Sequence, residues 1–171
     1  MEMKLSRCTL RRWRVGDEAS LERHANNRNV SRNLRDIFPY PYTAADATAW
    51  IESVKDESPV LNFAIAVDDA GVGGISVKLR KDIYRQSAEI GYWLGEAFWG
   101  RGIATEALRA VTDYAFATFP IIRLEAGVYS WNPASARVLE KVGYTLEGRL
   151  RRAIIKDDRV CDHLIYGLLR P

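Results

Sequence analysis

The chain has 171 residues, of which 47% are hydrophobic and 27% are charged, proportions that indicate a soluble globular protein rather than a disordered or fibrous one. This length predicts a single domain over residues 1–171. The net charge of +3 neither requires nor excludes nucleic acid, but it does not indicate the concentrated basic face of a nucleic-acid-binding protein, so we expect no nucleic-acid partner.

Cysteine and histidine are too few for a zinc site or a disulfide framework. The two cysteines, Cys8 and Cys161, lie near opposite ends, and the two histidines are His24 and His163. We expect no metal, a reducing cytoplasmic location, and surface or packing roles for both histidines. The N-terminus lacks the apolar core of a secretion signal, and no stretch has the length of a bilayer span, which predicts no membrane partner.

The first part of the chain alternates between short predicted elements. Residues Cys8–Trp13 read as a strand and Asp17–Asn27 as a helix capped by Asp17. The segment Asn33–Tyr42 contains two prolines and several aromatic residues, which predicts a loop. Thr43 begins a Thr-Ala-Ala-Asp sequence that resembles a capping box, so a helix is expected from there to about Lys55.

The middle of the chain predicts three strands. Leu61–Val67 and Val72–Leu79 flank an Asp-Asp-Ala-Gly turn and form a predicted hairpin. The third strand is Ala88–Leu94. Its alternation places Glu89, Gly91 and Trp93 on one face and Ile90, Tyr92 and Leu94 on the other.

The last third predicts two helices, a strand and a final hairpin. Apolar residues recur with helical spacing from Ile103 to Phe119, and Leu124–Tyr129 reads as a strand. A helix over Asn132–Val142 is expected to end at Gly143. Tyr144–Ile155 and Val160–Leu169 then pair as a hairpin. The order indicates a mixed α/β fold with about seven strands in one sheet and helices packed on it.

A glycine-containing turn joins the strand that ends at Leu94 to the helix that begins at Ile103. Gly100 and Gly102 allow the backbone to approach a ligand, and the first helical amides have no intrahelical partner. These amides and Arg101 suit a phosphate or pyrophosphate, although a plain tight turn explains the glycines equally well. The sequence is neither a P-loop nor a Rossmann fingerprint.

Several segments together resemble the GNAT acetyltransferases, in particular their RimJ/RimL-type branch. The similar segments are Phe38–Thr43, Trp99–Leu108, Asn132–Tyr144 and Glu147–Arg151. In the family pattern Arg/Gln-x-x-Gly-x-Gly/Ala, Gly102 and Ala104 match, whereas Trp99 occupies the Arg/Gln position. The resemblance implies the GNAT fold, a mostly antiparallel sheet in which two parallel strands, those ending at Leu94 and Tyr129, splay apart.

The same resemblance implies acetyl-CoA as the co-substrate, inserted between the splayed strands. The backbone of Tyr92 and Leu94 would pair with the pantetheine arm like an added strand. The pyrophosphate would lie on the turn and on its flanking residue Trp99. The turn is formed by Gly100, Arg101, Gly102, Ile103, Ala104 and Thr105. Asn132 matches a family asparagine that contacts pantetheine, and it is equally suited to be an ordinary N-cap before Pro133.

Acetyl transfer to an amine requires a base for the ammonium proton and an acid for the leaving thiolate. By resemblance Glu89 is the candidate base, and a solvent-facing or salt-bridged strand residue is its alternative. The usual family tyrosine acid is replaced by Leu139. Ser135, in the sequence Asn-Pro-Ala-Ser, is therefore the candidate acid, with a simple first-turn helix serine as its alternative.

The acceptor is expected to be a primary amine. The proline-braced loop offers Phe38, Tyr40 and Tyr42 as a wall for it. By resemblance the acceptor would be a protein N-terminus; a polyamine, an amino acid, an antibiotic or a non-catalytic acyl-CoA-binding role are the alternatives. The family resemblance also allows a homodimer.

Overall fold

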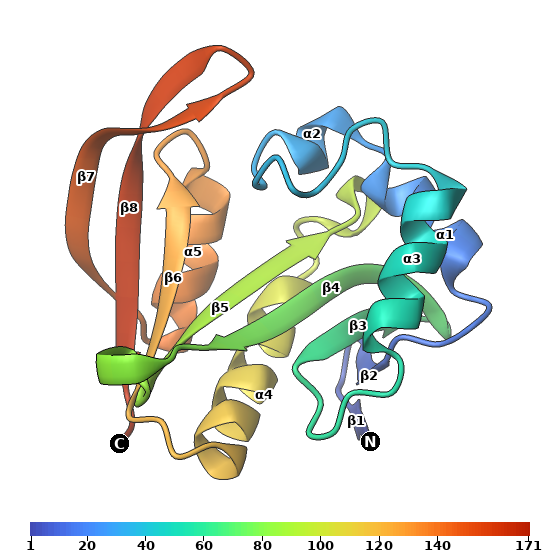
Figure 1. The fold of residues 1–171 in the computed structure, drawn as a ribbon, viewed down its shortest axis with the longest axis horizontal. Coiled ribbons are helices and arrows are strands. Elements are labelled where there is room, and N and C mark those ends of the chain that lie inside the picture. The colour runs from blue at the N-terminus through green and yellow to red at the C-terminus, as the bar shows by residue number, and fades with distance from the viewer. The chain divides into compact units, whose positions relative to one another are not determined.

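Eight strands form one sheet in the computed structural model, which describes residues 1–171 (Figure 1). The strand order is β1-β2-β3-β4-β5-β6-β8-β7. The strands are β1 (Glu2–Lys4), β2 (Thr9–Arg12), β3 (Asn62–Val67), β4 (Ala70–Leu79), β5 (Ser87–Leu94), β6 (Arg123–Tyr129), β7 (Thr145–Lys156) and β8 (Arg159–Leu169). Neighbours pair antiparallel in β1/β2, β2/β3, β3/β4, β6/β8 and β7/β8, and parallel in β5/β6. The expected mixed, mostly antiparallel sheet is confirmed, with the short β1 as an additional strand.

Five α-helices accompany the sheet, and none is long and apolar enough to cross a membrane. They are α1 (Glu18–Ala25), α2 (Arg28–Ser31), α3 (Ala44–Val54), α4 (Ile103–Thr118) and α5 (Pro133–Val142). The predicted capping box is present, because Thr43 and Asp46 exchange side-chain and backbone hydrogen bonds. The predicted end of α5 is also confirmed, since Gly143 has a left-handed φ of 104°. The single-turn α2 carries no sequence pattern and was not expected.

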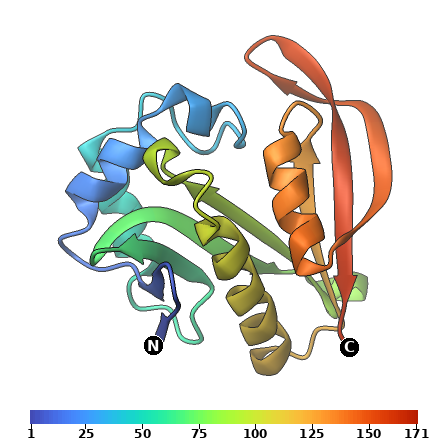
Figure 2. The ribbon, with the colours of Figure 1, turned by 180° about the vertical axis from the view of Figure 1, so that it is seen from behind.

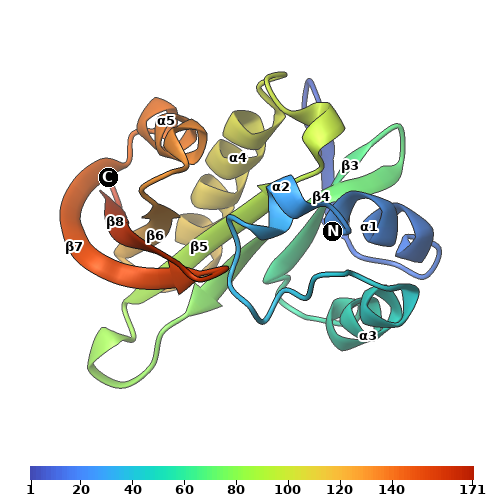
Figure 3. The same ribbon diagram turned by 90° about the horizontal axis from the view of Figure 1, so that it is seen from above.

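The chain divides into two compact units, the first of which contains residues 1–76 and 92–107. In this unit α1 and α3 lie side by side (Figure 3). Their apolar faces, which include Leu21 of α1 and Ile51 of α3, pack together with Trp13. All three residues are at most 2% exposed. The sequence pattern of α1 and α3 therefore produces this part of the core directly, because each helix has one apolar face to bury.

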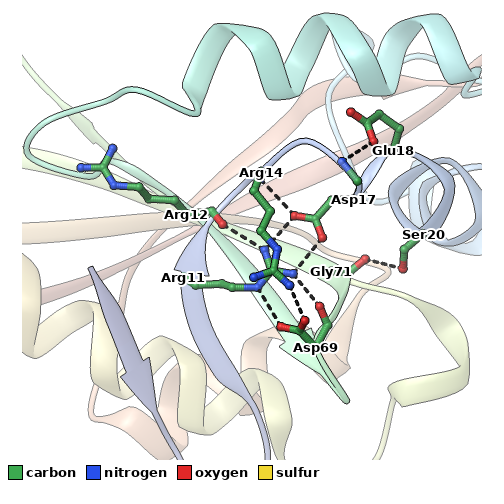
Figure 4. Close-up of polar contacts among 9 residues, drawn as sticks. Arg11, Arg12, Arg14, Asp17, Glu18, Ser20, Asp69 and Gly71 are labelled. Atoms are coloured by element: carbon green, nitrogen blue, oxygen red, sulfur yellow. Dashed lines mark hydrogen bonds and ion pairs between the residues drawn. The ribbon is translucent and has the colours of Figure 1, made fainter.

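An ion-pair cluster fastens β2 to the start of α1 and to the turn between β3 and β4 (Figure 4). Arg11 donates to both carboxylate oxygens of Asp17 at 2.7 and 2.8 Å and to the carbonyl of Asp69. Only 4% of Arg11 and of Asp17 is exposed. Asp17 is the N-cap residue of α1, as predicted, but its side chain makes no cap bond. Its oxygens bind Arg11 and the amide of Arg14 instead.

The second unit contains residues 77–91 and 108–171. In it β6, β8 and β7 form an antiparallel segment with α5 on one face (Figure 2). Leu124 and Leu139 are fully buried. Tyr144 is also buried, and its hydroxyl lies 2.9 Å from that of Thr112, so the polar atom of this core tyrosine is satisfied.

Candidate functional site

The turn between β5 and α4 has the conformation that its glycines predict. Gly100 and Gly102 have φ values of 75° and 77°, a region that residues with a Cβ adopt only with strain. A Cβ on Gly100 would have no neighbour within 4 Å, so open space lies above it. The amide of Glu106 bonds to the carbonyl of Gly102, which leaves the amides of the preceding helical turn, Ile103, Ala104 and Thr105, without intrahelical acceptors. The turn can therefore receive an anion.

Arg7 is a cation beside this turn that the sequence analysis missed. A Cβ on Gly102 would lie 3.3 Å from Arg7 Nε. Glu106, in the first turn of α4, accepts hydrogen bonds from the amides of Ser6 and Arg7 at 3.0 and 2.9 Å. Burial alone would raise the pKa of Glu106, but the bonds from Ser6 and Arg7 lower it below its usual value. Because this contact joins distant parts of the chain, no local pattern could have identified Arg7.

Other predicted residues of the turn have visible structural contacts. The indole of Trp99 donates to the carbonyl of Leu94 at 2.7 Å, so one acceptor site of that carbonyl is already used. The guanidinium of Arg101 lies 5.3 Å from the ring centre of Phe98 and is exposed. Tyr92 is half-buried, and Leu94 is buried. Trp99 thus fixes the turn onto the end of β5.

The aromatic loop packs against Trp93 of β5, a contact that was not predicted. Phe38 lies 5.0 Å from Tyr42 and 5.5 Å from Trp93, measured between ring centres. Tyr42 is 5% exposed, and burial raises its pKa to about 12. Tyr40 is exposed, with the guanidinium of Arg28 5.0 Å from its ring centre. Of the three predicted wall residues, Tyr40 and Phe38 reach the surface, and Tyr42 supports them from the core.

In the second unit, the parallel ladder between β5 and β6 is short. It joins Ser87, Ala88 and Glu89 to Arg123, Leu124 and Glu125. Both strands continue beyond the ladder, β5 to Leu94 and β6 to Tyr129. The strands therefore stop pairing after Glu89 and Glu125, as expected for two splayed parallel strands.

Glu89 and Glu125 are direct neighbours across this ladder and share one face of the sheet. Glu125 forms ion pairs with Arg80 and with Arg123, and Arg123 also donates to Glu147 at 2.8 Å. These arginines offset the charge of Glu125. Glu89 lies beside the point where the two strands part.

His163 lies on the same face, over Gly127 of β6. A Cβ on Gly127 would be only 2.0 Å from His163 Nε2, so only glycine leaves room for the ring. Burial lowers the pKa of His163, and the charge of Glu89 opposes this shift. A lone histidine in the sequence predicts a surface or packing role, and the half-buried ring of His163 does pack on Gly127. His24 also packs, in the first unit, against Gly95 and Phe98.

Asn132 and Ser135 meet at the start of α5. Asn132 Oδ1 accepts the Ser135 amide at 3.3 Å, so the predicted N-cap is present. The Asn132 amide group is a donor that a ligand carbonyl could use. Leu139, at the position of the usual family tyrosine, is fully buried.

Two groups of candidate residues are thus assembled, one in each unit. The first combines the glycine turn with Arg7, and the second places Glu89 with His163 and Asn132 with Ser135. No group of three or more His, Cys, Asp or Glu side chains is arranged to hold a metal ion.

Comparison with known proteins identifies relatives of the chain. The acetyltransferase (GNAT) domain matches residues 7–145. Probable N-acetyltransferase YjcK of Bacillus subtilis is 40% identical over 117 residues, 68% of this chain and 65% of YjcK, slightly less than two thirds of that relative. The ribosomal-protein-serine acetyltransferase of Escherichia coli is 34% identical over 105 residues, 61% of this chain and 58% of its own length.

The fold has a matching solved structure. RimL, a ribosomal L7/L12 alpha-N-protein acetyltransferase crystallised with coenzyme A, aligns over 99% of this chain and 98% of its own, with a TM-score of 0.85 and 21% identity. At this identity the likeness shows the fold.

Proposed function

The chain belongs to the GNAT family and is an acyl-CoA-dependent N-acetyltransferase, and we propose that it acetylates the amino terminus of a protein, as a member of the RimJ/RimL-type branch. The observation that carries the acetyl-CoA part is the turn at Gly100 and Gly102, with its open space and the Arg7 cation beside it. The identity with a ribosomal-protein-serine acetyltransferase supports the acceptor.

The glycine turn suits the pyrophosphate of acetyl-CoA. Its amides from Gly100 to Thr105 carry the positive end of the α4 dipole, and Arg7, which is ion-paired with Glu106 at 3.9 Å, adds a guanidinium that can donate to a phosphate. Asn132 supplies a side-chain amide for the pantetheine arm, and Tyr92 and Leu94 supply backbone groups. Acetyl-CoA brings a thioester, whose carbonyl carbon the acceptor amine attacks directly.

The residues on either side of the parting strands supply the proton transfers. On the sheet face, Glu89 draws the proton from the acceptor ammonium, so that a neutral amine can attack. In α5, Ser135 offers its hydroxyl to the sulfur of the departing thiolate. Because a thiolate leaves readily near neutral pH, the Ser135→Ala variant should be slower but still active. Phe38 and Tyr40 offer an apolar wall for the first residues of the acceptor.

A matched pair of peptides tests the acceptor. One peptide has a free α-amine and a blocked lysine, and the other has the reverse. We expect release of CoA thiol from acetyl-CoA with the first peptide only. Spermidine, free amino acids and an aminoglycoside are assayed beside the peptides. Faster release of CoA thiol with one of these small amines would contradict a protein N-terminus as the acceptor and assign a small-amine acceptor. No release with any amine, despite binding of acetyl-CoA, would contradict transfer to an amine altogether.

A further inference from the structure

The short connection between β5 and α4 contains a glutamate that contacts two parts of the first unit. After β5 the chain forms the short 3-10 helix η2 (Glu96–Phe98) and then enters the glycine turn. The backbone carbonyl of Glu96 accepts the amide of Trp99 at 3.1 Å, and Trp99 directly precedes Gly100. The backbone of Glu96 therefore supports the glycine turn, while its side chain makes a separate set of contacts.

Two asparagines at the start of α2 bind the Glu96 carboxylate. Its Oε2 accepts a hydrogen bond from Asn27 Nδ2 at 2.7 Å, and its Oε1 accepts one from Asn29 Nδ2 at 2.9 Å. Asn27 is also the N-cap of α2, because its Oδ1 accepts the Asn29 amide at 2.8 Å. This cap bond fixes the orientation of the Asn27 side chain, so its Nδ2 is directed at Glu96. We call the two bonds to the carboxylate the Glu96 clamp.

Close packing against α1 fixes the position of η2. The ring of His24, from α1, lies on Gly95, where a Cβ would be 2.9 Å from His24 Nδ1. The centre of the same ring lies 5.3 Å from that of Phe98. Glu96 stands between Gly95 and Phe98 in the chain, so its carboxylate reaches α2 from a fixed support.

α2 in turn supports the aromatic loop. Arg28, between the two asparagines of the clamp, places its guanidinium 5.0 Å from the ring centre of Tyr40, which is a cation–π distance. Asn26, directly before the cap residue, accepts the amide of Tyr42 on its Oδ1 at 3.1 Å. The place of the exposed Tyr40 ring therefore depends on the place of α2.

This helix is too short to keep its position without such contacts. α2 has four residues, and isolated helices shorter than about 12 residues are marginal in water. The buried side chains of Val30 and Ser31 hold its C-terminal half. The Glu96 clamp holds its N-terminal half, where Arg28 lies.

We propose that Glu96 is a positioning residue for the acceptor: it holds α2, and through α2 it sets the place of Tyr40 and the affinity for the acceptor. The inference rests on the proposed function, in which Phe38 and Tyr40 form the acceptor wall. When the clamp is broken, α2 moves, and only a fraction of the molecules presents the wall in its binding arrangement. The apparent dissociation constant of the acceptor then rises in inverse proportion to that fraction.

Steady-state kinetics of Glu96→Ala test the clamp. This variant removes both bonds and should raise the KM for an N-terminal peptide about tenfold, as for the loss of hydrogen bonds to a charged group. Its kcat and its Kd for acetyl-CoA should be unchanged, because the carbonyl bond to Trp99 persists. Glu52→Ala, which removes an exposed carboxylate paired with Lys55 in α3, is the matched control and should change neither constant. An unchanged KM in Glu96→Ala, or an equal loss of acetyl-CoA affinity, would overturn the inference.

Asn27→Asp separates the clamp from the helix cap. Aspartate caps a helix as well as asparagine does, but it places a second carboxylate against that of Glu96. The two charges repel each other, so this variant should raise the peptide KM as Glu96→Ala does. Adding Glu96→Gln should restore the KM, because the glutamine amide can donate to the new aspartate. Additive losses in the double variant would overturn the inference, since the two positions would then be uncoupled.

Hydrogen exchange in the enzyme without acceptor keeps the test independent of the acceptor. In Glu96→Ala, the amides of α2 and of Tyr42 should exchange faster than in the wild type, and those of α3 should not. Unchanged exchange in α2 would overturn the inference even if the enzyme is active. Faster exchange in α2 of a chain that acetylates no peptide would confirm the clamp and place the failure in the proposed function.

Discussion

The Arg11 cluster gives a quantitative prediction about stability, through the Asp17→Asn variant. Arg11 binds Asp17 through two hydrogen bonds of 2.7 and 2.8 Å, and each side chain is 5% exposed. Asparagine keeps the shape of the aspartate but removes its charge and turns an amide group toward the guanidinium. The Arg11 charge then remains buried, with the exposed carboxylate of Asp69 3.7 Å from its Nε.

The expected loss follows from burial. Removing one member of a buried ion pair typically costs about 3–5 kcal/mol, because the remaining charge is not solvated. For a chain of this size, each kcal/mol lowers the melting temperature by roughly 2–4 °C. Asp17→Asn should therefore melt roughly 6–20 °C below the wild type.

Asp69→Asn is the matched control on the same guanidinium. The Asp69 side chain is 74% exposed, so the same change there should lower the free energy of unfolding by less than about 1 kcal/mol. Urea unfolding followed by circular dichroism gives the free energy of unfolding of each variant. An m-value equal to that of the wild type shows that the unfolding transitions are comparable. Equal losses in the two variants would refute the argument that burial decides the strength of these pairs.

Three further outcomes are expected. Gly102→Ala should weaken acetyl-CoA binding more than Gly100→Ala does. Both glycines have positive φ, but only the Cβ on Gly102 would approach Arg7. Equal Kd values of the two variants, measured by calorimetry, would contradict this expectation. Arg7→Gln should raise the KM for acetyl-CoA about tenfold, as for loss of one charge-assisted hydrogen bond, with the acceptor KM unchanged in steady-state kinetics. Burial raises the pKa of Tyr42 and of Tyr144 to about 12 from 10.0; the unfolded chain therefore loses these protons first, and stability should fall between pH 10 and 12. Tyr144→Phe should flatten that decline in alkaline urea titrations, and an unaltered slope would count against it.

The sequence by itself determined the order of the elements apart from β1 and α2, and the position of the glycine turn before α4. Apolar periodicity and local capping residues are properties of neighbouring positions, so the capping box at Thr43 and the left-handed Gly143 could be predicted. The glycine turn before Ile103 could be predicted for the same reason, because a strand, two glycines and a helix lie in one continuous segment.

Contacts between distant segments were decided only by the tertiary structure. Asp17 has the sequence of a helix cap, yet its carboxylate binds Arg11, because a buried guanidinium competes more strongly for it than the helix amides do. Arg7 reaches the glycine turn only because Glu106 holds the residues before β2. His163 shows the same limit: its neighbours Gly127 and Glu89 are brought to it by strand pairing, and a lone histidine in the sequence carries no sign of that register.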